Sequence, residues 1–185
     1  MKKSTRIQER VEELQKSAPP AVPGLYSPYY ESYFTCFDAA EYYEAHDVLE
    51  HLWLHDTEEK SPHWFLYKGL IQLAGAYVHL KKHYFRPHHY KFANRLHPAV
   101  RLFHLALQNT SSNNLQALDL NISAVHNLIR RDLTKIENSN FSENPWRPEK
   151  APRLSPLRFK GTPENLLFGI EAGQNKSLRP RQHRS

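Results

Sequence analysis

The sequence predicts an all-α protein, a bundle of five or six helices followed by an extended basic tail. Three observations favour this fold class. Apolar residues recur at helical spacing in segments between residues 4 and 137. No stretch alternates apolar and polar residues as a half-buried strand does. From residue 138 onward the helical pattern stops, and prolines and basic residues take over: Pro145, Pro148, Pro152, Pro156 and Pro163.

The chain divides into three parts by composition. Residues 1–27 hold an amphipathic helix, with apolar residues at i, i+4 and i+7, and a Pro-rich linker that must end it. Residues 28–137 form the helical bundle domain. Residues 138–185 are expected to be extended, docked in part through Phe141, Trp146 and Leu157, and then disordered.

Within the bundle the pattern predicts a short aromatic helix over residues 29–37 and four longer helices, over residues 41–53 or slightly beyond, 63–82, 87–108 and 115–137. Asp38 is the predicted N-cap of the second of these five, with Glu41 completing an approximate capping box. Pro98 should kink or split the helix that contains it, and Asn121 should interrupt the last one.

Composition excludes several classes of protein. Cys36 is the single cysteine, so the chain can form neither a disulfide framework nor a cysteine-based zinc site. No apolar run reaches membrane-spanning length, and the N-terminal residues lack the apolar centre of a signal peptide. We therefore expect a cytoplasmic protein without membrane contact. Twelve histidines, ten of them between His46 and His104, predict sensitivity to pH near neutrality.

The net charge of +6 belongs to the tail. Residues 147–185 hold nine Lys and Arg against three Asp and Glu, and residues 1–146 hold sixteen of each. The tail is therefore a candidate for weak contact with nucleic acid or another acidic partner, whereas the bundle itself is not a predicted nucleic-acid binder.

The central helix, residues 41–53, carries a histidine and a glutamate on its apolar face. At about 100° per residue, Glu50 lies within roughly 60° of His46, together with several apolar residues. The same geometry places Glu44, Asp47 and His51 on the far side. A buried carboxylate is costly unless it is paired, so His46 and Glu50 are expected to meet polar partners.

The next helix, residues 63–82, is apolar nearly all round and is therefore expected to be buried. One strip on it is small or polar: Phe65, Lys68, Gly69, Gln72, Gly75, Ala76 and His79. Packing this strip against the central helix would form a buried cluster of His46, Glu50, Gln72 and His79, with the two histidines facing one another. Tyr43 and Trp53 would flank the cluster.

Three interpretations of this cluster remain open. The first is a structural hydrogen-bond network that fixes the register of two helices, with Glu50 compensated by His46 or Lys68. The second is a small-molecule or hydrolytic site, with Glu50 as general base and His46 or His79 as acid. The third is a metal site of His46, Glu50 and His79, for which the spacing is the weakest support. The ligand-binding candidates are Tyr43, Glu44, Trp53, Lys68 and Gln72.

The two central helices carry a motif of twelve residues: Glu44, Ala45, His46, Leu49, Glu50, Trp53, Gly69, Leu70, Ile71, Gln72, Ala74 and His79. This motif resembles the signature of an all-helical family of bacteria and plastids, domain of unknown function 309. The family signature runs E-A-H-E-x-L-E-x-x-W, then G-L-I-Q-x-A and a later histidine, and here Asp47 replaces the usual second Glu. After the second helix, KKHYFRPHHYKFAN replaces the family's Gly-Asn turn and Gly-Ala pair. The resemblance covers about residues 30–135. It implies a compact orthogonal helical bundle and no activity.

Two classes of function follow. One is a site for a small molecule, catalytic or not, on the central helix pair. The other is a non-enzymatic scaffold or interaction module whose polar seam is structural. An open cavity beside the seam would favour the first, and a sealed seam with an apolar surface patch elsewhere would favour the second. The sequence specifies neither a cofactor nor an oligomeric state.

Overall fold

The structure is a computed structural model that describes residues 3–17, 26–55, 63–91, 94–111 and 119–158. Within these ranges the prediction of an all-α fold is confirmed, and the one β contact is an isolated bridge between Leu120 and Arg158. The elements are α1 (Lys3–Ser17), α2 (Pro28–Asp38), α3 (Tyr42–His55), α4 (Trp64–Phe85), α5 (Leu96–Asn109), α6 (Ile122–Asn138) and two short 3-10 helices, η1 (Pro148–Lys150) and η2 (Ser155–Leu157).

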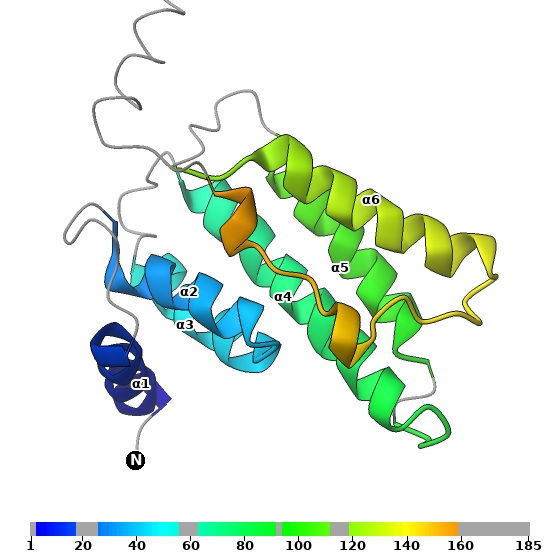
Figure 1. Cartoon of the computed structure of the whole chain (residues 1–185), viewed down its shortest axis with the longest axis horizontal. Coiled ribbons are helices and arrows are strands. Elements are labelled where there is room, and N and C mark those ends of the chain that lie inside the picture. Colours follow the sequence, from blue (N-terminus) through cyan, green and yellow to red (C-terminus); the bar gives the residue numbers. More distant parts are fainter. Residues whose placement is uncertain (1–2, 18–25, 56–62, 92–93, 112–118, 159–185) are drawn as a thin grey trace, which may run out of the picture.

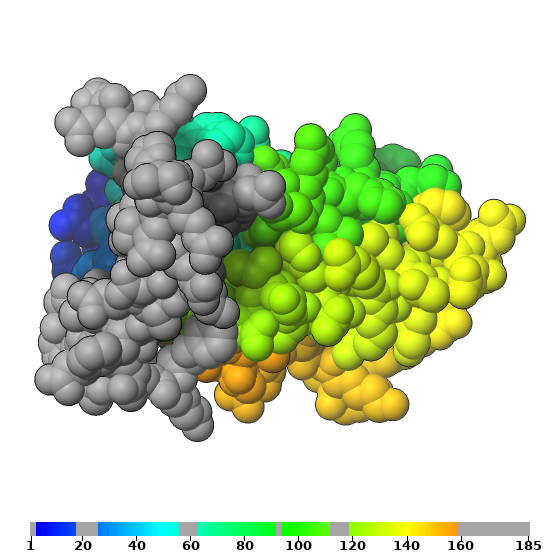
Figure 2. All heavy atoms as spheres, turned by 90° about the horizontal axis from the view of Figure 1, so that it is seen from above, coloured from blue at the N-terminus to red at the C-terminus, as the bar shows by residue number. Residues whose placement is uncertain are grey.

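Helix α4 is the centre of the arrangement. It packs against α3 on one side and α5 on the other, while α2 covers α3 and α6 covers α5 (Figure 1). Helix α1 lies against α2 and α3, far from α5 and α6. Figure 2 shows α5 and α6 side by side, forming one face of the molecule, with the segment that carries η1 and η2 along its edge. Any site on α3 therefore has α1 on one flank and α4 on the other.

The N-terminal helix forms as its periodicity predicts. Ile7, Val11 and Leu14 are buried, and the first two form a small apolar cluster with Val48 of α3. Helix α1 is thus a packing element and not a free arm. The predicted Pro-rich break lies outside the described residues.

The prediction that Asp38 caps α3 is wrong. Asp38 is the last residue of α2, and its Oδ1 accepts a hydrogen bond from the backbone N of Leu154 at 2.6 Å. The turn that follows uses Ala40 with φ of 57°, and α3 starts only at Tyr42. The Asp38 carboxylate therefore does not cap a helix, and it anchors the segment around Leu154.

The core of the bundle is aromatic. Tyrosine and phenylalanine rings from α2, α3, α4 and α5 contact one another in a continuous series of tilted and edge-to-face pairs: Tyr30, Tyr33, Phe34, Phe37, Tyr42, Tyr77 and Phe103. The buried hydroxyls of this series have hydrogen-bond partners, as burial requires. Tyr33 donates to the carbonyl of Leu70 at 2.8 Å, and Tyr77 donates to Oδ2 of Asp132 at 2.7 Å.

A helix that starts at Pro87 and is kinked at Pro98 was predicted, and this is wrong. Helix α5 starts only at Leu96, so Pro98 falls in its first turn. A proline costs nothing there, because the first backbone N–H groups of a helix have no intrahelical acceptor. Asn121 is the N-cap of α6, and its side chain accepts from the backbone N of Ala124. Most of the predicted helix before Asn121 lies outside the described residues, so its interruption there stays a prediction.

Residues 139–158 are docked on the bundle, as predicted for the first part of the tail. Trp146 and Leu154 are buried in the main core, and Phe141 and Leu157 pack against it. Arg158 ends the described segment with two hydrogen bonds of 2.7 Å to Glu31 and one to Asp119. The boundary at residue 138 stays a prediction, since no domain division is evident in these contacts, and residues from 159 lie outside the described part.

In the described part of the chain, no helix combines the length and the apolar character that crossing a bilayer requires.

Candidate functional site

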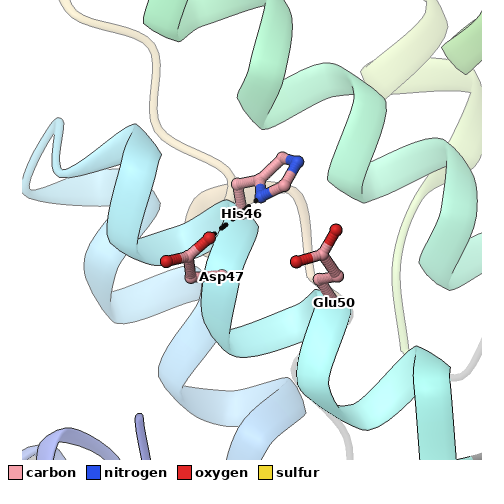
Figure 3. Close-up of side chains that lie close together, drawn as sticks. All are labelled: His46, Asp47 and Glu50. Atoms are coloured by element: carbon pink, nitrogen blue, oxygen red, sulfur yellow. Dashed lines mark hydrogen bonds and ion pairs between the residues drawn. The ribbon is translucent and has the colours of Figure 1, made fainter. Parts of the chain in front are cut away.

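Helix α3 brings three ligating side chains together. His46 Nδ1 lies 3.3 Å from Oδ1 of Asp47, and one ligating atom from each of His46, Asp47 and Glu50 lies within 4.8 Å of the others. Figure 3 shows Glu50 one turn beyond the linked pair. The prediction that His46 and Glu50 are at the centre of the buried face is wrong. That face is centred on Ala45 and Leu49, about a quarter turn away.

Asp47, predicted on the far side, is the buried member of the three. Its side chain is 2% exposed and accepts from Arg6 Nη2 at 3.0 Å and from Lys3 Nζ at 3.1 Å. The same ammonium lies 2.9 Å from Oε2 of Glu50, whose side chain is 31% exposed. Sequence periodicity missed this arrangement because α1, distant in sequence, covers the second face of α3.

The small and polar strip of α4 faces α5, and the prediction that it packs on the polar residues of α3 is wrong for most of its length. A Cβ atom on Gly69 would lie 2.5 Å from Cγ2 of Thr110. Gln72 Oε1 accepts from Asn109 Nδ2 at 2.7 Å. A Cβ atom on Gly75 would lie 3.3 Å from Cδ1 of Leu102 in α5 and 3.9 Å from Cδ2 of His46 in α3, so this position lies between the two helices. The absence of a side chain at Gly69 is what allows α5 to approach so closely.

His79 pairs with Arg95, just before α5. Arg95 Nη1 lies 3.2 Å from Nδ1 of His79. Burial, and after it the positive charge of Arg95, lowers the pKa of His79 to about 4. A neutral imidazole that accepts a hydrogen bond from a guanidinium is a structural partner for α5, and His46 has a different partner in Asp47.

The remaining candidates are dispersed. The Trp53 ring packs at a tilt against Trp64, with 5.2 Å between ring centroids, and Lys68 lies over the Trp64 ring. Glu44 pairs at 3.9 Å with Arg6. Tyr43 is 55% exposed. None of the four joins Gln72 or His79, so the single cluster that the sequence predicts is divided among three neighbourhoods.

Metal ligation was predicted for His46, Glu50 and His79, and the structure groups Asp47 with the first two instead. An imidazole nitrogen and two carboxylates are suitable ligands for zinc or iron. The ammonium of Lys3, however, already supplies a cation to both carboxylates. The geometry thus accounts for Asp47 and Glu50 as the residues that hold α1 on α3 through ion pairs. Metal or acid–base roles for the polar residues of α3 stay predictions.

A groove that the sequence analysis missed lies between the start of α3 and the end of α4. Its volume is about 600 Å³. The residues that form its walls include Ala40, Tyr43, Val78, Lys82, Phe85 and Arg86. Phe85 is 60% exposed. The signal in the sequence was the pair of aromatic residues among four basic ones in KKHYFR, at the end of a helix that was predicted to be wholly buried.

Residues 30–88 match the family described as Domain of unknown function (DUF309). They comprise most of α2, all of α3 and α4, and both walls of the groove. The resemblance seen in the sequence is thereby confirmed for this segment, and the class of protein is a helical domain to which the family description assigns no activity. Neither a curated protein nor a solved structure matches the chain.

Proposed function

We propose that this protein is a non-enzymatic interaction module, in which the helical bundle is a scaffold and the groove between α3 and α4 is the binding surface. The groove supports this most directly. It leaves Tyr43 and Phe85 more than half exposed on one wall each. Large apolar side chains grouped in one concave surface are typical of protein interaction sites.

The polar seam supports the same proposal by exclusion. Gln72 is hydrogen-bonded to Asn109 and His79 to Arg95, so these two polar groups of α4 already have partners in or just before α5. Asp47 and Glu50 hold α1. A general base needs an open position for a substrate within hydrogen-bond reach, and the groove is lined by none of His46, Glu50 or His79.

Photo-crosslinking tests the proposal. The photoreactive residue benzoylphenylalanine in place of Phe85 should yield an adduct of one defined mass in cells, and the same residue at Tyr90, which is exposed outside the groove, should not. Adding Tyr43→Ser to the first variant should remove the adduct, whereas Glu50→Gln should not. Equal adducts from both positions, or loss with Glu50→Gln alone, would contradict a docking groove.

Two earlier expectations belong with this proposal. Weak contact of the basic tail with nucleic acid would have to come mainly from residues outside the described part, because Arg158 is already held by Glu31 and Asp119. A cytoplasmic setting fits Cys36, which is buried and unpaired, and whose thiol pKa is raised to about 12 by burial. Such a thiol is inert under reducing conditions.

A further inference from the structure

The groove has an apolar floor and a positive rim. Tyr43, Val78 and Phe85 supply apolar surface, and three cations come from the last turns of α4 and the residue after it, Lys81, Lys82 and Arg86. Glu41 and Glu44 are the acidic residues that also line it. Whether the groove selects a charge therefore depends on how these five ionised groups are paired.

The two glutamates are engaged from outside the groove. Glu41 Oε2 lies 2.8 Å from Arg10 Nη2, and Glu44 Oε1 lies 3.9 Å from Arg6 Nη1. Both arginines belong to α1. Arg10 thus compensates Glu41, and Arg6, which also binds Asp47, offsets part of the charge of Glu44, while the basic wall is left unmatched.

The three cations have no carboxylate partner among the described residues. Lys81 Nζ donates to the backbone carbonyl of Ala40 at 2.9 Å, and Lys82 lies 5.9 Å from the centroid of the Tyr43 ring. Neither contact neutralises a charge. Lys82 and Arg86 are exposed, so both can reach a ligand at the rim without moving the backbone.

From this pairing we propose that the occupant of the groove is an acidic amphipathic segment of a partner protein. Its apolar side chains lie on Tyr43, Val78 and Phe85, and its carboxylates meet Lys82 and Arg86. A helix laid in a hydrophobic groove, with charges matched at the rim, is a common mode of peptide recognition, and charge complementarity adds selectivity and association rate. This inference rests on the proposed function and specifies its partner by chemistry.

Three synthetic peptides test the charge preference. Each is a fluorescein-labelled helical peptide with the same Leu and Phe face and with Glu, Gln or Lys at all other positions, and binding to the full chain is followed by anisotropy. The Glu peptide should bind about tenfold more tightly than the Gln peptide, and the Lys peptide most weakly. The difference should shrink as salt rises from about 50 to 300 mM, because rim charges are screened.

Variants locate the effect. Lys82→Glu with Arg86→Glu should reverse the order of the Glu and Lys peptides, while Lys135→Glu, an equally exposed charge reversal on α6, should leave it unchanged. Phe85→Ser should weaken all three peptides together. If the groove reversal behaves as Lys135→Glu does, or if the three peptides bind equally, the acidic partner is ruled out.

The remaining outcomes identify other occupants or remove the proposed function. Equal binding of all peptides that still requires Phe85 would retain the docking groove and reject only its preference for acid. No binding, together with no crosslink from position 85, would reject the docking groove itself. A dimer that Phe85→Ser dissociates would make a second copy the occupant. If the double variant Leu167→Ser with Phe168→Ser binds the peptides more tightly than the parent, the chain's own C-terminal residues occupy the groove. Either of these last two results, the dimer or the tighter binding, overturns the proposal.

Discussion

The indole Nε1 of Trp146 donates a hydrogen bond of 2.9 Å to the hydroxyl of Tyr42, 104 residues earlier in the chain. Both side chains are buried. The contact joins the segment after α6 to the first residue of α3, next to the groove. The segment that composition marked as the start of a tail therefore completes the core behind the proposed binding surface.

Trp146→Ala should destabilise the fold by about 3–5 kcal/mol, the usual cost of deleting a buried aromatic side chain. Tyr42→Phe, which removes only the acceptor, should cost about 1–3 kcal/mol for a buried donor left unpaired. Urea unfolding measures both.

Shortening the chain after Pro163 should leave the melting temperature nearly unchanged, and a large decrease would show that later residues also belong to the core.

Gly69→Ala should destabilise the contact between α4 and α5. The new Cβ would lie 2.5 Å from Cγ2 of Thr110 and 3.3 Å from the carbonyl oxygen of Ala106, and overpacking of this kind costs about 1–3 kcal/mol. Thr110→Ser should rescue most of the loss, since it deletes Cγ2 and keeps the hydroxyl that bonds Ala106 and His126. A double-mutant cycle in thermal unfolding measures the coupling.

The matched control is Gly75→Ala. Its nearest obstacle would be Cδ1 of Leu102 at 3.3 Å, the end of a flexible side chain, and alanine favours a helix over glycine by about 1 kcal/mol. The change should be close to neutral. If the two glycine variants lose equal stability, close approach of α5 is not the reason for Gly69.

Local patterns predicted the helices well, because each depends on residues three or four apart. The stripe of Ile7, Val11 and Leu14 is an example. The prediction of a helix from Pro87 was wrong because the apolar and aromatic residues after it have the pattern of a helix, whereas residues 87–91 are turns and α5 starts at Leu96. Propensity decides such boundaries poorly where tertiary contacts compete.

The site was predicted less well, for a physical reason that α3 illustrates. Counting Tyr43 and Trp53 as core residues rotated the predicted buried face toward His46. Tyr43 is in fact exposed in the groove, and Asp47, the most polar residue of the middle turn, is buried beneath α1. Which helix covers which face is a non-local property, and one chain's periodicity does not contain it.

Asp47→Asn should loosen α1 far more than Glu50→Gln. Asp47 is buried and its carboxylate binds both Lys3 and Arg6, so losing its charge should cost about 1–3 kcal/mol. The Lys3–Glu50 pair joins side chains that are 54% and 31% exposed, and such pairs contribute about 1 kcal/mol or less. Hydrogen exchange of the α1 amides should rise strongly in the first variant and little in the second. If the α1 amides exchange at comparable rates in both variants, α1 is held on α3 by the apolar contacts of Ile7, Val11 and Val48 and not by Asp47.

The last prediction concerns acid stability and His79. The pKa of His79 is lowered from 6.5 to about 4 in the folded protein, by burial first and then by Arg95, Lys82 and Arg101. Between these values the unfolded chain binds a proton that the folded chain does not, so protonation favours unfolding. The stabilisation is therefore fully present above pH 6.5 and is lost as the pH falls toward 4. Burial also lowers the pKa of His51, His83 and His126. These three histidines therefore add to the stability that is lost as the pH falls.

A comparison of variants isolates the contribution of His79. His79→Gln keeps an acceptor for Arg95 and removes the titration, so its free energy of unfolding should fall less between about pH 7 and pH 4.5 than that of the parent, by on the order of 1 kcal/mol. Arg95→Gln should flatten the profile in part, because it removes the nearest positive charge. Urea unfolding at both pH values measures the difference. A His79→Gln profile as steep as the parent's would mean that this imidazole takes up its proton without opening the contact with Arg95.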